Sequence, residues 1–169
     1  MSDVLTRWNR LPAEEAEQEI LACCASRAWA NQLAARRPLD ATSLTRASDE
    51  IWSRLKPEDW HEAFSRHPRI GARKAPSAAT AQSASWSAQE QKRVANAPDS
   101  IQDELAEANH RYEQRFGRVF IVCATGKSAQ EMLDILRRRL QNNDATELLA
   151  AAEEQLKITN LRLQKWLSQ

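Results

Sequence analysis

Glycine and tyrosine are scarce in this chain, with three glycines and one tyrosine among 169 residues. β-Sandwiches and barrels need many tight turns, in which glycine is a preferred residue, so this scarcity argues against both folds. Alanine, leucine, glutamate and arginine, which favour helices, fill long stretches instead. Hydrophobic residues make up 42% and charged residues 28%, a balance typical of a folded globular protein. The composition therefore predicts an all-α fold.

A strong excess of charge and a long apolar run are also absent. The net charge is +1, so no strong field would recruit nucleic acid or an anionic membrane. The arginines Arg137-Arg138-Arg139 are interpreted as one solvated end of a helix. No apolar stretch is long enough to span a bilayer, and the N-terminus lacks the apolar core of a signal peptide. We therefore expect neither nucleic acid nor a membrane as a partner.

The cysteines Cys23, Cys24 and Cys123 are odd in number, and two of them are adjacent. This arrangement gives no disulfide framework and suits a reducing compartment, so a cytoplasmic location is expected. The histidines are not accompanied by cysteine pairs or by a His-Glu-x-x-His run, so no metal site is expected.

The hydrophobic pattern has neither an internal repeat nor a linker, so residues 1–169 are interpreted as a single domain. We expect a compact fold of about seven to nine helices, with one short extended apolar segment near residues 119–124. Residues 69–86 are rich in alanine, serine and basic residues and are interpreted as a loop or a poorly ordered turn of helix. Helices are predicted over residues 3–8, 14–35 (where the pattern allows a break near Ser26), 43–55, 58–65 and 100–116, and onward from Ser128 and from Asp144.

The run His67-Pro68-Arg69-Ile70-Gly71 is the first candidate for chemistry. Histidine has an unperturbed pKa near neutrality, so a positioned histidine can donate or accept a proton. A histidine before a proline is also common in ordinary loops, so a purely structural role for His67 stays open.

The second candidate is Ser87-Ala88-Gln89-Glu90-Gln91, which places a carboxylate beside an amide at an expected helix start. The Glu90 carboxylate could set the tautomer of a histidine or hold a polar group of a substrate. Ser-x-x-Glu is also the spacing of a capping box, and spacing alone favours this structural role for Glu90.

The third candidate is the apolar run Val119-Phe120-Ile121-Val122-Cys123-Ala124, which lies between Gly117 and Gly126. Its pattern predicts a buried extended segment. One such segment does not form a sheet, so its backbone N–H and C=O groups would be available to bind a polar ligand.

These three runs occur in order with two others, one from Asn109 to Gly117 and one from Ile158 to Leu163. Over residues 9–167 the chain thereby resembles the 2-oxo-4-hydroxy-4-carboxy-5-ureidoimidazoline (OHCU) decarboxylases of urate catabolism. The resemblance implies an all-α fold, commonly a homodimer, with neither a metal nor an organic cofactor. It also implies the substrate and the reaction, which is the stereoselective loss of CO2 from OHCU to give (S)-allantoin.

The resemblance implies roles for individual residues as well. His67 falls on the family's catalytic histidine, and Pro68 on a position that contacts the substrate. Ser87, Ala88, Gln89, Glu90 and Gln91 match a substrate-binding segment in which Glu90 is the important carboxylate. Phe120, Ile121, Val122, Cys123 and Ala124 match a segment whose backbone contacts the substrate, and Arg162 matches an arginine near the pocket.

Two departures from the family pattern concern local packing rather than the motifs. Lys92-Arg93 stand where many members have small residues or glycine, and Leu39 replaces the usual aromatic residue after Arg37-Pro38.

Two other functional classes stay open on the sequence. The chain could be a helical interaction module without chemistry, if His67 and Glu90 have only the loop and capping roles. It could also be a different cofactor-free lyase that acts on another small anion. An enzyme of either kind requires His67 and Glu90 to converge with residues 120–124, whereas a module would leave them on separate surfaces.

Overall fold

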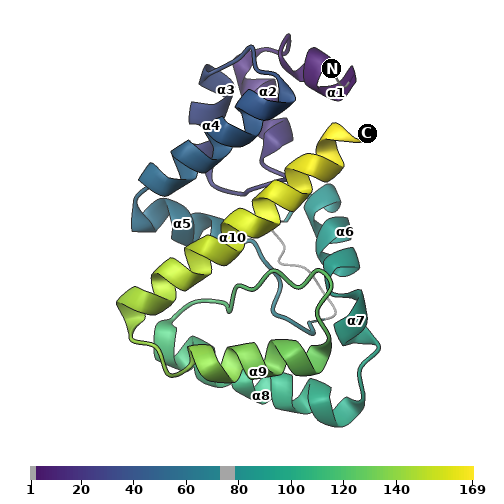
Figure 1. The fold of residues 1–169 in the computed structure, drawn as a ribbon, viewed down its shortest axis with the longest axis vertical. Coiled ribbons are helices and arrows are strands. Elements are labelled where there is room, and N and C mark those ends of the chain that lie inside the picture. Colours follow the sequence, from purple (N-terminus) through teal and green to yellow (C-terminus); the bar gives the residue numbers. More distant parts are fainter. Residues whose placement is uncertain (1–2, 73–78) are drawn as a thin grey trace. The chain divides into compact units, whose positions relative to one another are not determined.

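The computed structural model describes residues 3–72 and 79–169, and these residues form ten helices (Figure 1). This confirms the all-α prediction, and the count exceeds nine because Lys92–Ala95 forms an additional short helix. The helices are α1 (Asp3–Trp8), α2 (Ala13–Ile20), α3 (Arg27–Ala35), α4 (Ala41–Arg54), α5 (Pro57–Phe64), α6 (Ala81–Glu90), α7 (Lys92–Ala95), α8 (Asp99–Phe116), α9 (Ala129–Arg139) and α10 (Asp144–Leu167).

The chain divides into two compact units. The first contains the residues up to Ala63 together with Leu156–Gln169, and the second contains Phe64–Gln155. Helix α10 therefore contributes its N-terminal half to the second unit and its C-terminal half to the first. None of the helices in the described part of the chain combines the length and the hydropathy that crossing a bilayer requires.

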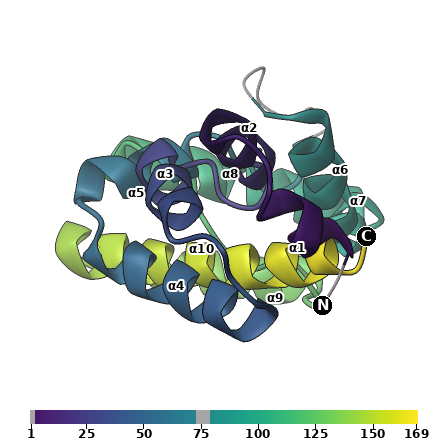
Figure 2. The same cartoon turned by 90° about the horizontal axis from the view of Figure 1, so that it is seen from above.

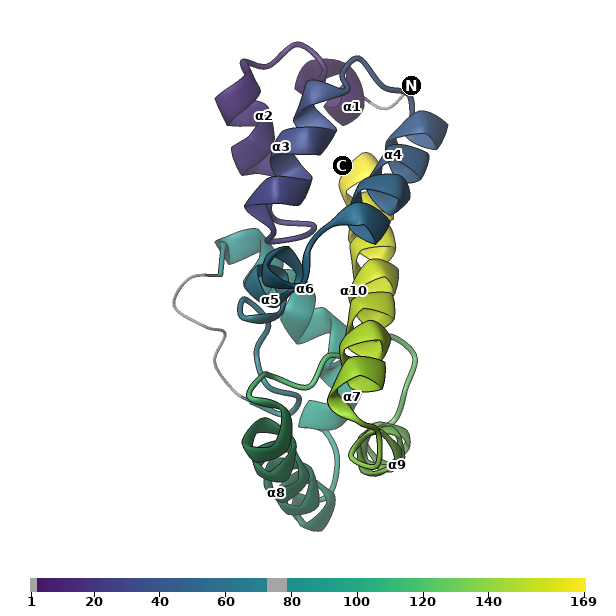
Figure 3. The same cartoon turned by 90° about the vertical axis from the view of Figure 1, so that its left-hand side faces the viewer.

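The first unit is built around buried tryptophans. Helix α3 packs against both α2 and α4 (Figures 2 and 3). The Trp8 and Trp166 rings meet edge to face with centroids 5.8 Å apart. The Trp8 indole N–H donates to the Ala16 carbonyl at 2.9 Å, so the ring is buried without leaving its polar atom unpaired.

Two sequence expectations are settled in this unit. Ser26 interrupts the helix predicted over residues 14–35, because its Oγ accepts the Trp29 N–H at 3.3 Å and caps α3. The Asn9 side chain donates to the Leu39 carbonyl at 2.8 Å and accepts the Leu39 N–H at 3.0 Å. This link uses only the backbone of residue 39, so it does not require the family's usual aromatic side chain there.

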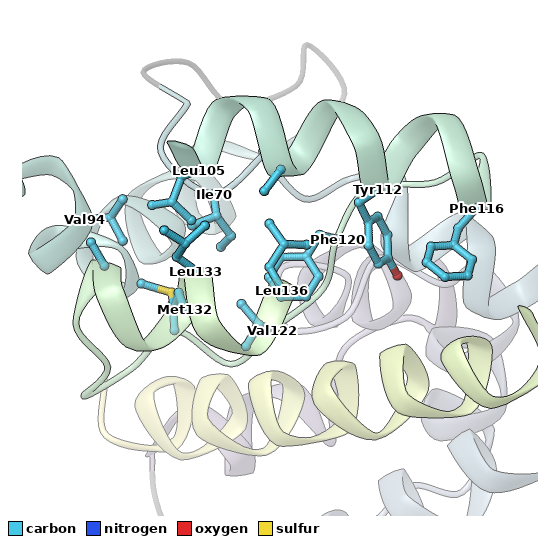
Figure 4. Packing of buried hydrophobic residues seen from close by; sticks show 13 residues of the cluster. Ile70, Val94, Leu105, Tyr112, Phe116, Phe120, Val122, Met132, Leu133 and Leu136 are labelled. Carbon is cyan, nitrogen blue, oxygen red and sulfur yellow. The ribbon is translucent and has the colours of Figure 1, made fainter. Parts of the chain in front are cut away.

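The core of the second unit lies between α8 and α9 (Figure 4). Helix α8 ends as predicted at Gly117, whose φ of 67° is a left-handed conformation that favours glycine. Helix α9 begins as predicted with a capping box, in which Ser128 and Glu131 exchange hydrogen bonds. These signals fix the two ends of the chain segment between the helices, and this segment contains residues 119–124.

Helix α6 corrects two predictions. It begins at Ala81, where the Thr80 Oγ1 accepts the Ser83 N–H at 3.1 Å, so the second part of the predicted loop over residues 69–86 is helical. Ser87 and Glu90 lie in the last turn of α6 and not at a helix start. The capping-box interpretation of Glu90 was therefore wrong. Residues 73–78 of the predicted loop, including its breaker Pro76, lie outside the described residues.

Candidate active site

His67 lies in a short connection that follows α5 and is tied down by α8. The Asn109 side chain donates from Nδ2 to the Ile70 carbonyl at 3.1 Å. Arg69 donates to the Glu113 carboxylate through two bonds of 2.5 and 2.8 Å. Both partners belong to α8, so the run from Asn109 to Gly117 holds the connection that carries His67.

The His67 imidazole contacts a buried amide of α10. The His67 Nε2 lies 2.7 Å from the Gln155 Oε1, and the Gln155 side chain is fully buried. When this oxygen accepts the bond, the ring proton of a neutral His67 resides on Nε2, and Nδ1 carries the lone pair. Gln155 thus fixes the orientation of the ring while remaining uncharged.

The two polar runs meet directly. The Gly71 backbone N–H donates to the Gln91 Oε1 at 3.0 Å. Gly71 has a φ of 85°, a conformation that other residues adopt only with strain, and this backbone turn places its N–H beside Gln91. This bond joins the two runs at Gly71 and Gln91, and the convergence of His67 and Glu90 with residues 120–124 in one cleft stays a prediction.

A cleft lies where these runs meet, with a volume of about 720 Å³. Its polar groups include those of Ser87, Gln91, Asn96, Asp99 and Gln102, so it suits a small polar ligand. Pro68, Ser87, Ala88 and Gln91 are the predicted site residues among its lining, whereas His67, Glu90 and residues 120–124 do not line it.

Glu90 occupies an unfavourable place for a carboxylate. It is the last residue of α6, where the partial negative charge of the helix end disfavours an acidic group. Its charge acts on Cys123: burial raises the pKa of the Cys123 thiol most, Lys127 lowers it, and Glu154 and Glu90 raise it. Glu90 is therefore close enough to the 120–124 segment to affect it electrostatically.

Residues 120–124 are buried, and they belong to neither a helix nor a strand in the described part of the chain. The Cys123 N–H donates to the Glu154 Oε2 at 2.7 Å, and the Cys123 carbonyl accepts from the Lys127 Nζ at 2.7 Å. The Ile121 carbonyl accepts from Arg139. The prediction that this whole backbone is available for a ligand was therefore wrong at Ile121 and Cys123.

The remaining backbone groups of this segment have a different environment. Within residues 3–72 and 79–169, the N–H and C=O groups of Phe120 and Val122 and the N–H of Ala124 make no hydrogen bond. In a planar trans peptide unit the C=O of one residue and the N–H of the next point in opposite directions. The bonds at Ile121 and Cys123 are thus made to protein side chains, whereas the groups that share their peptide planes, which belong to Val122 and Ala124, are unpaired. Buried backbone groups without a partner are rare, and they suit a polar ligand.

The cysteines do not provide a nucleophile. All three are buried and unpaired with one another. Burial raises the pKa of Cys123, as above, and raises the pKa of Cys24 to about 11. The thiols therefore stay protonated near neutral pH, whereas nucleophilic attack requires the thiolate.

Arg162 belongs to the first unit, whereas the other predicted site residues belong to the second. It lies on α10, is buried, and its Nη1 is 3.5 Å from the Ala22 carbonyl. A role for Arg162 beside a substrate stays a prediction.

Three polar residues in contact with the candidate site were not predicted from the sequence: Gln155, Glu154 and Lys127. A signal for Gln155 exists in α10, where Glu147, Gln155 and Arg162 recur at intervals of about two helical turns and are all buried. No sequence pattern indicated Glu154 or Lys127, because both bind the backbone of residues 120–124 and not another side chain.

The fold is that of a small all-α protein in which α10 places Gln155 beside His67 and Glu154 beside the backbone of Cys123. The chain belongs to the OHCU decarboxylase family, whose model matches residues 9–164. It is 37% identical over 156 residues to the uric acid degradation bifunctional protein TTL of Arabidopsis thaliana, which covers 92% of this chain and 48% of that protein. It is 45% identical over 56 residues to the 2-oxo-4-hydroxy-4-carboxy-5-ureidoimidazoline decarboxylase of Amia calva, covering 33% of this chain and 32% of the relative.

Solved structures agree with this assignment. A crystal structure of OHCU decarboxylase in the presence of (S)-allantoin superposes with a TM-score of 0.77 at 37% identity, covering 89% of this chain and 98% of that one. A crystal structure of (S)-allantoin synthase superposes with a TM-score of 0.70 at 17% identity, covering 96% of this chain and 53% of that one, and shows the shared fold alone. The chain spans about half the length of the Arabidopsis relative and a smaller part of the other curated relatives it matches.

Proposed function

We propose that this protein decarboxylates OHCU to (S)-allantoin in urate catabolism. The observation that carries the proposal is the convergence of the two polar runs, which the hydrogen bond between Gly71 and Gln91 joins. The first run also contains a histidine held by a buried amide, an arrangement that an interaction module does not need. The membership in the OHCU decarboxylase family selects OHCU among the small anions that another lyase could use.

The substrate contains its own electron sink. OHCU carries a carboxylate and a hydroxyl on one ring carbon, beside a ring carbon that is doubly bonded to nitrogen. When the bond to the carboxylate breaks, its electron pair forms a double bond between the two ring carbons, and the C=N pair moves to nitrogen, which takes a proton. The hydroxyl proton then leaves, and the neighbouring ring carbon gains a proton. No cofactor is needed to accept the electrons.

The protein must therefore orient the substrate and deliver a proton to one face. We assign His67 as the general acid and base. Gln155 holds its ring, and His67 is the only histidine in the two polar runs, residues 67–71 and 87–91. Glu90 would orient His67 or hold the hydroxyl and ureido groups of the substrate. The unpaired backbone groups of Phe120 and Val122 and the unpaired N–H of Ala124 offer donors and acceptors for the ureido and ring carbonyl groups.

A rate measurement tests this proposal. OHCU is generated in place from urate with a urate oxidase and a hydroxyisourate hydrolase, and its decay is followed by absorbance. We expect the decay rate to rise in proportion to the concentration of this protein, and to do so equally after dialysis against a chelator. An unchanged decay would favour the interaction module or a lyase for another anion. Loss of the acceleration with the chelator would contradict the metal-free mechanism.

We further infer a cytoplasmic location, which the three unpaired, buried cysteines support. The homodimer stays a prediction from the family resemblance, and sedimentation equilibrium would determine it.

A further inference from the structure

A buried ion pair lies behind the 120–124 segment. Arg139 donates to the Glu147 Oε1 from Nε at 2.8 Å and from Nη2 at 2.5 Å, and both residues are buried. The Tyr112 hydroxyl donates to the same oxygen at 2.6 Å, and the Asn142 side chain donates to Glu147 Oε2 at 3.0 Å. The prediction that Arg139 belongs to a solvated helix end was therefore wrong. Four hydrogen bonds hold the Glu147 carboxylate, which in turn fixes the guanidinium.

The fixed guanidinium contacts two consecutive residues of the segment. Its Nη1 donates to the Ile121 carbonyl, and its central carbon lies 4.7 Å from the centroid of the Phe120 ring. The Tyr112 ring packs edge-on against the same Phe120 ring at 5.3 Å (Figure 4). Arg139 therefore restrains both the backbone direction at Ile121 and the side chain at Phe120.

This restraint reaches the unpaired groups through the planar peptide units. The Ile121 carbonyl and the Val122 N–H lie in one peptide plane and point in opposite directions, so the bond at the Ile121 carbonyl also sets the direction of the unpaired Val122 N–H. Glu154 and Lys127 restrain the backbone in the same way at Cys123, two residues farther along the chain. The positions of the unpaired groups thus depend on side chains that a ligand would not touch.

Stability alone does not require this arrangement. A buried ion pair costs desolvation, and well-packed hydrophobic residues of similar volume are often as stable or more stable. Arginine is nevertheless suited to the geometry here, since its planar fork binds a carboxylate and a carbonyl while its face stacks on an aromatic ring. We propose that Arg139, held by Glu147, is a positioning residue that aims the backbone of residues 120–124 at the substrate. This inference rests on the proposed function and adds residues that determine its binding geometry.

The test replaces the pair by hydrophobic residues of similar size, in the double variant Arg139→Met with Glu147→Leu. We expect this protein to remain folded, with a melting temperature near or above that of the wild type. Its kcat/KM for OHCU should fall roughly ten- to a hundredfold, mostly through a higher KM, because the substrate-facing backbone is misplaced. The amide protons of residues 119–126 should exchange faster with deuterium, a readout that does not depend on activity.

Two control variants separate positioning from stability. Arg137→Lys changes an exposed arginine of the same helix, which pairs with Glu104 at 2.5 Å, and should leave KM and amide exchange unchanged. Asp40→Ala removes the capping box of α4 in the first unit, so it should lower the melting temperature without raising KM. Arg139→Lys, which keeps the charge without the planar fork, should raise KM and speed the exchange as the double variant does.

Unchanged KM and unchanged exchange in both Arg139 variants would overturn the inference. A rise in KM that follows the loss of melting temperature across all variants, including Asp40→Ala, would also overturn it, because Arg139 would then act through stability alone. If the wild type does not decarboxylate OHCU, the proposed function fails, and the amide exchange of residues 119–126 still decides whether Arg139 positions this backbone.

Discussion

Replacing His67 by glutamine is expected to lower kcat for OHCU by about a hundred- to ten-thousand-fold, the usual contribution of general acid–base catalysis. The amide of glutamine can occupy the place of the imidazole Nε2 and keep a hydrogen bond to Gln155, but it cannot transfer a proton near neutral pH. The fold should therefore survive while turnover is lost. Steady-state kinetics with OHCU, together with a melting curve, measure both.

His61 provides the matched control for this variant. It is exposed on α5 and belongs to the first unit, so His61→Gln makes the same chemical change outside the unit that contains His67. Near-normal turnover of a folded His67→Gln protein would remove His67 from the mechanism. An equal loss in both variants would show that the change of residue type, and not its position, is responsible.

The second large effect is expected at Glu90. Glu90→Gln keeps the size of the side chain and removes the charge, so turnover should fall about ten- to a hundredfold, the value of a charge-assisted hydrogen bond. The free energy of unfolding should stay within about 1 kcal/mol of the wild-type value or increase. The substitution removes a negative charge from the C-terminal end of α6, where the helix dipole disfavours it. Chemical denaturation and OHCU kinetics on the same preparation give the two quantities.

Glu131 is a carboxylate with a structural role and no expected role in catalysis, so it provides the comparison for Glu90. Its carboxylate accepts the Ser128 N–H at 2.6 Å at the start of α9, which is the capping role that the spacing had suggested for Glu90. Glu131→Ala, which removes the acceptor of the Ser128 N–H, should lower the melting temperature and leave turnover unchanged. If Glu90→Gln instead lowers stability and preserves turnover, the carboxylate of Glu90 is structural.

Signals with a local physical cause were predictive of the fold. Gly117 ends α8 because it can adopt a positive φ, and Ser128 begins α9 because Glu131 stands three residues later. The same Ser-x-x-Glu spacing misled at Ser87, since it also occurs inside a helix that Thr80 had already capped. The first turns of α6 consist largely of alanine and serine, which gave no apolar period to reveal the helix.

The candidate site was predicted in part. His67 and Gln91 stand in short runs with a recognisable order of chemical groups, and the structure joins those runs at Gly71. Such short runs could not predict Gln155 or Arg139, because both act through tertiary contacts. Gln155 contacts His67, 88 residues away along the chain, and Arg139 contacts Ile121, 18 residues away. A polar residue on a helix is usually solvated, and only its burial identifies it as a partner of the site.

The handedness of the product tests the central claim most directly. A pocket with one positioned proton donor delivers the proton to one face of the ring, whereas OHCU that decays in buffer gives racemic allantoin. With OHCU generated in place, circular dichroism of the product should show an accumulating (S)-allantoin signal with the wild type and a nearly flat trace with His67→Gln. A racemic product at an unchanged decay rate in the presence of the wild-type protein would contradict the account.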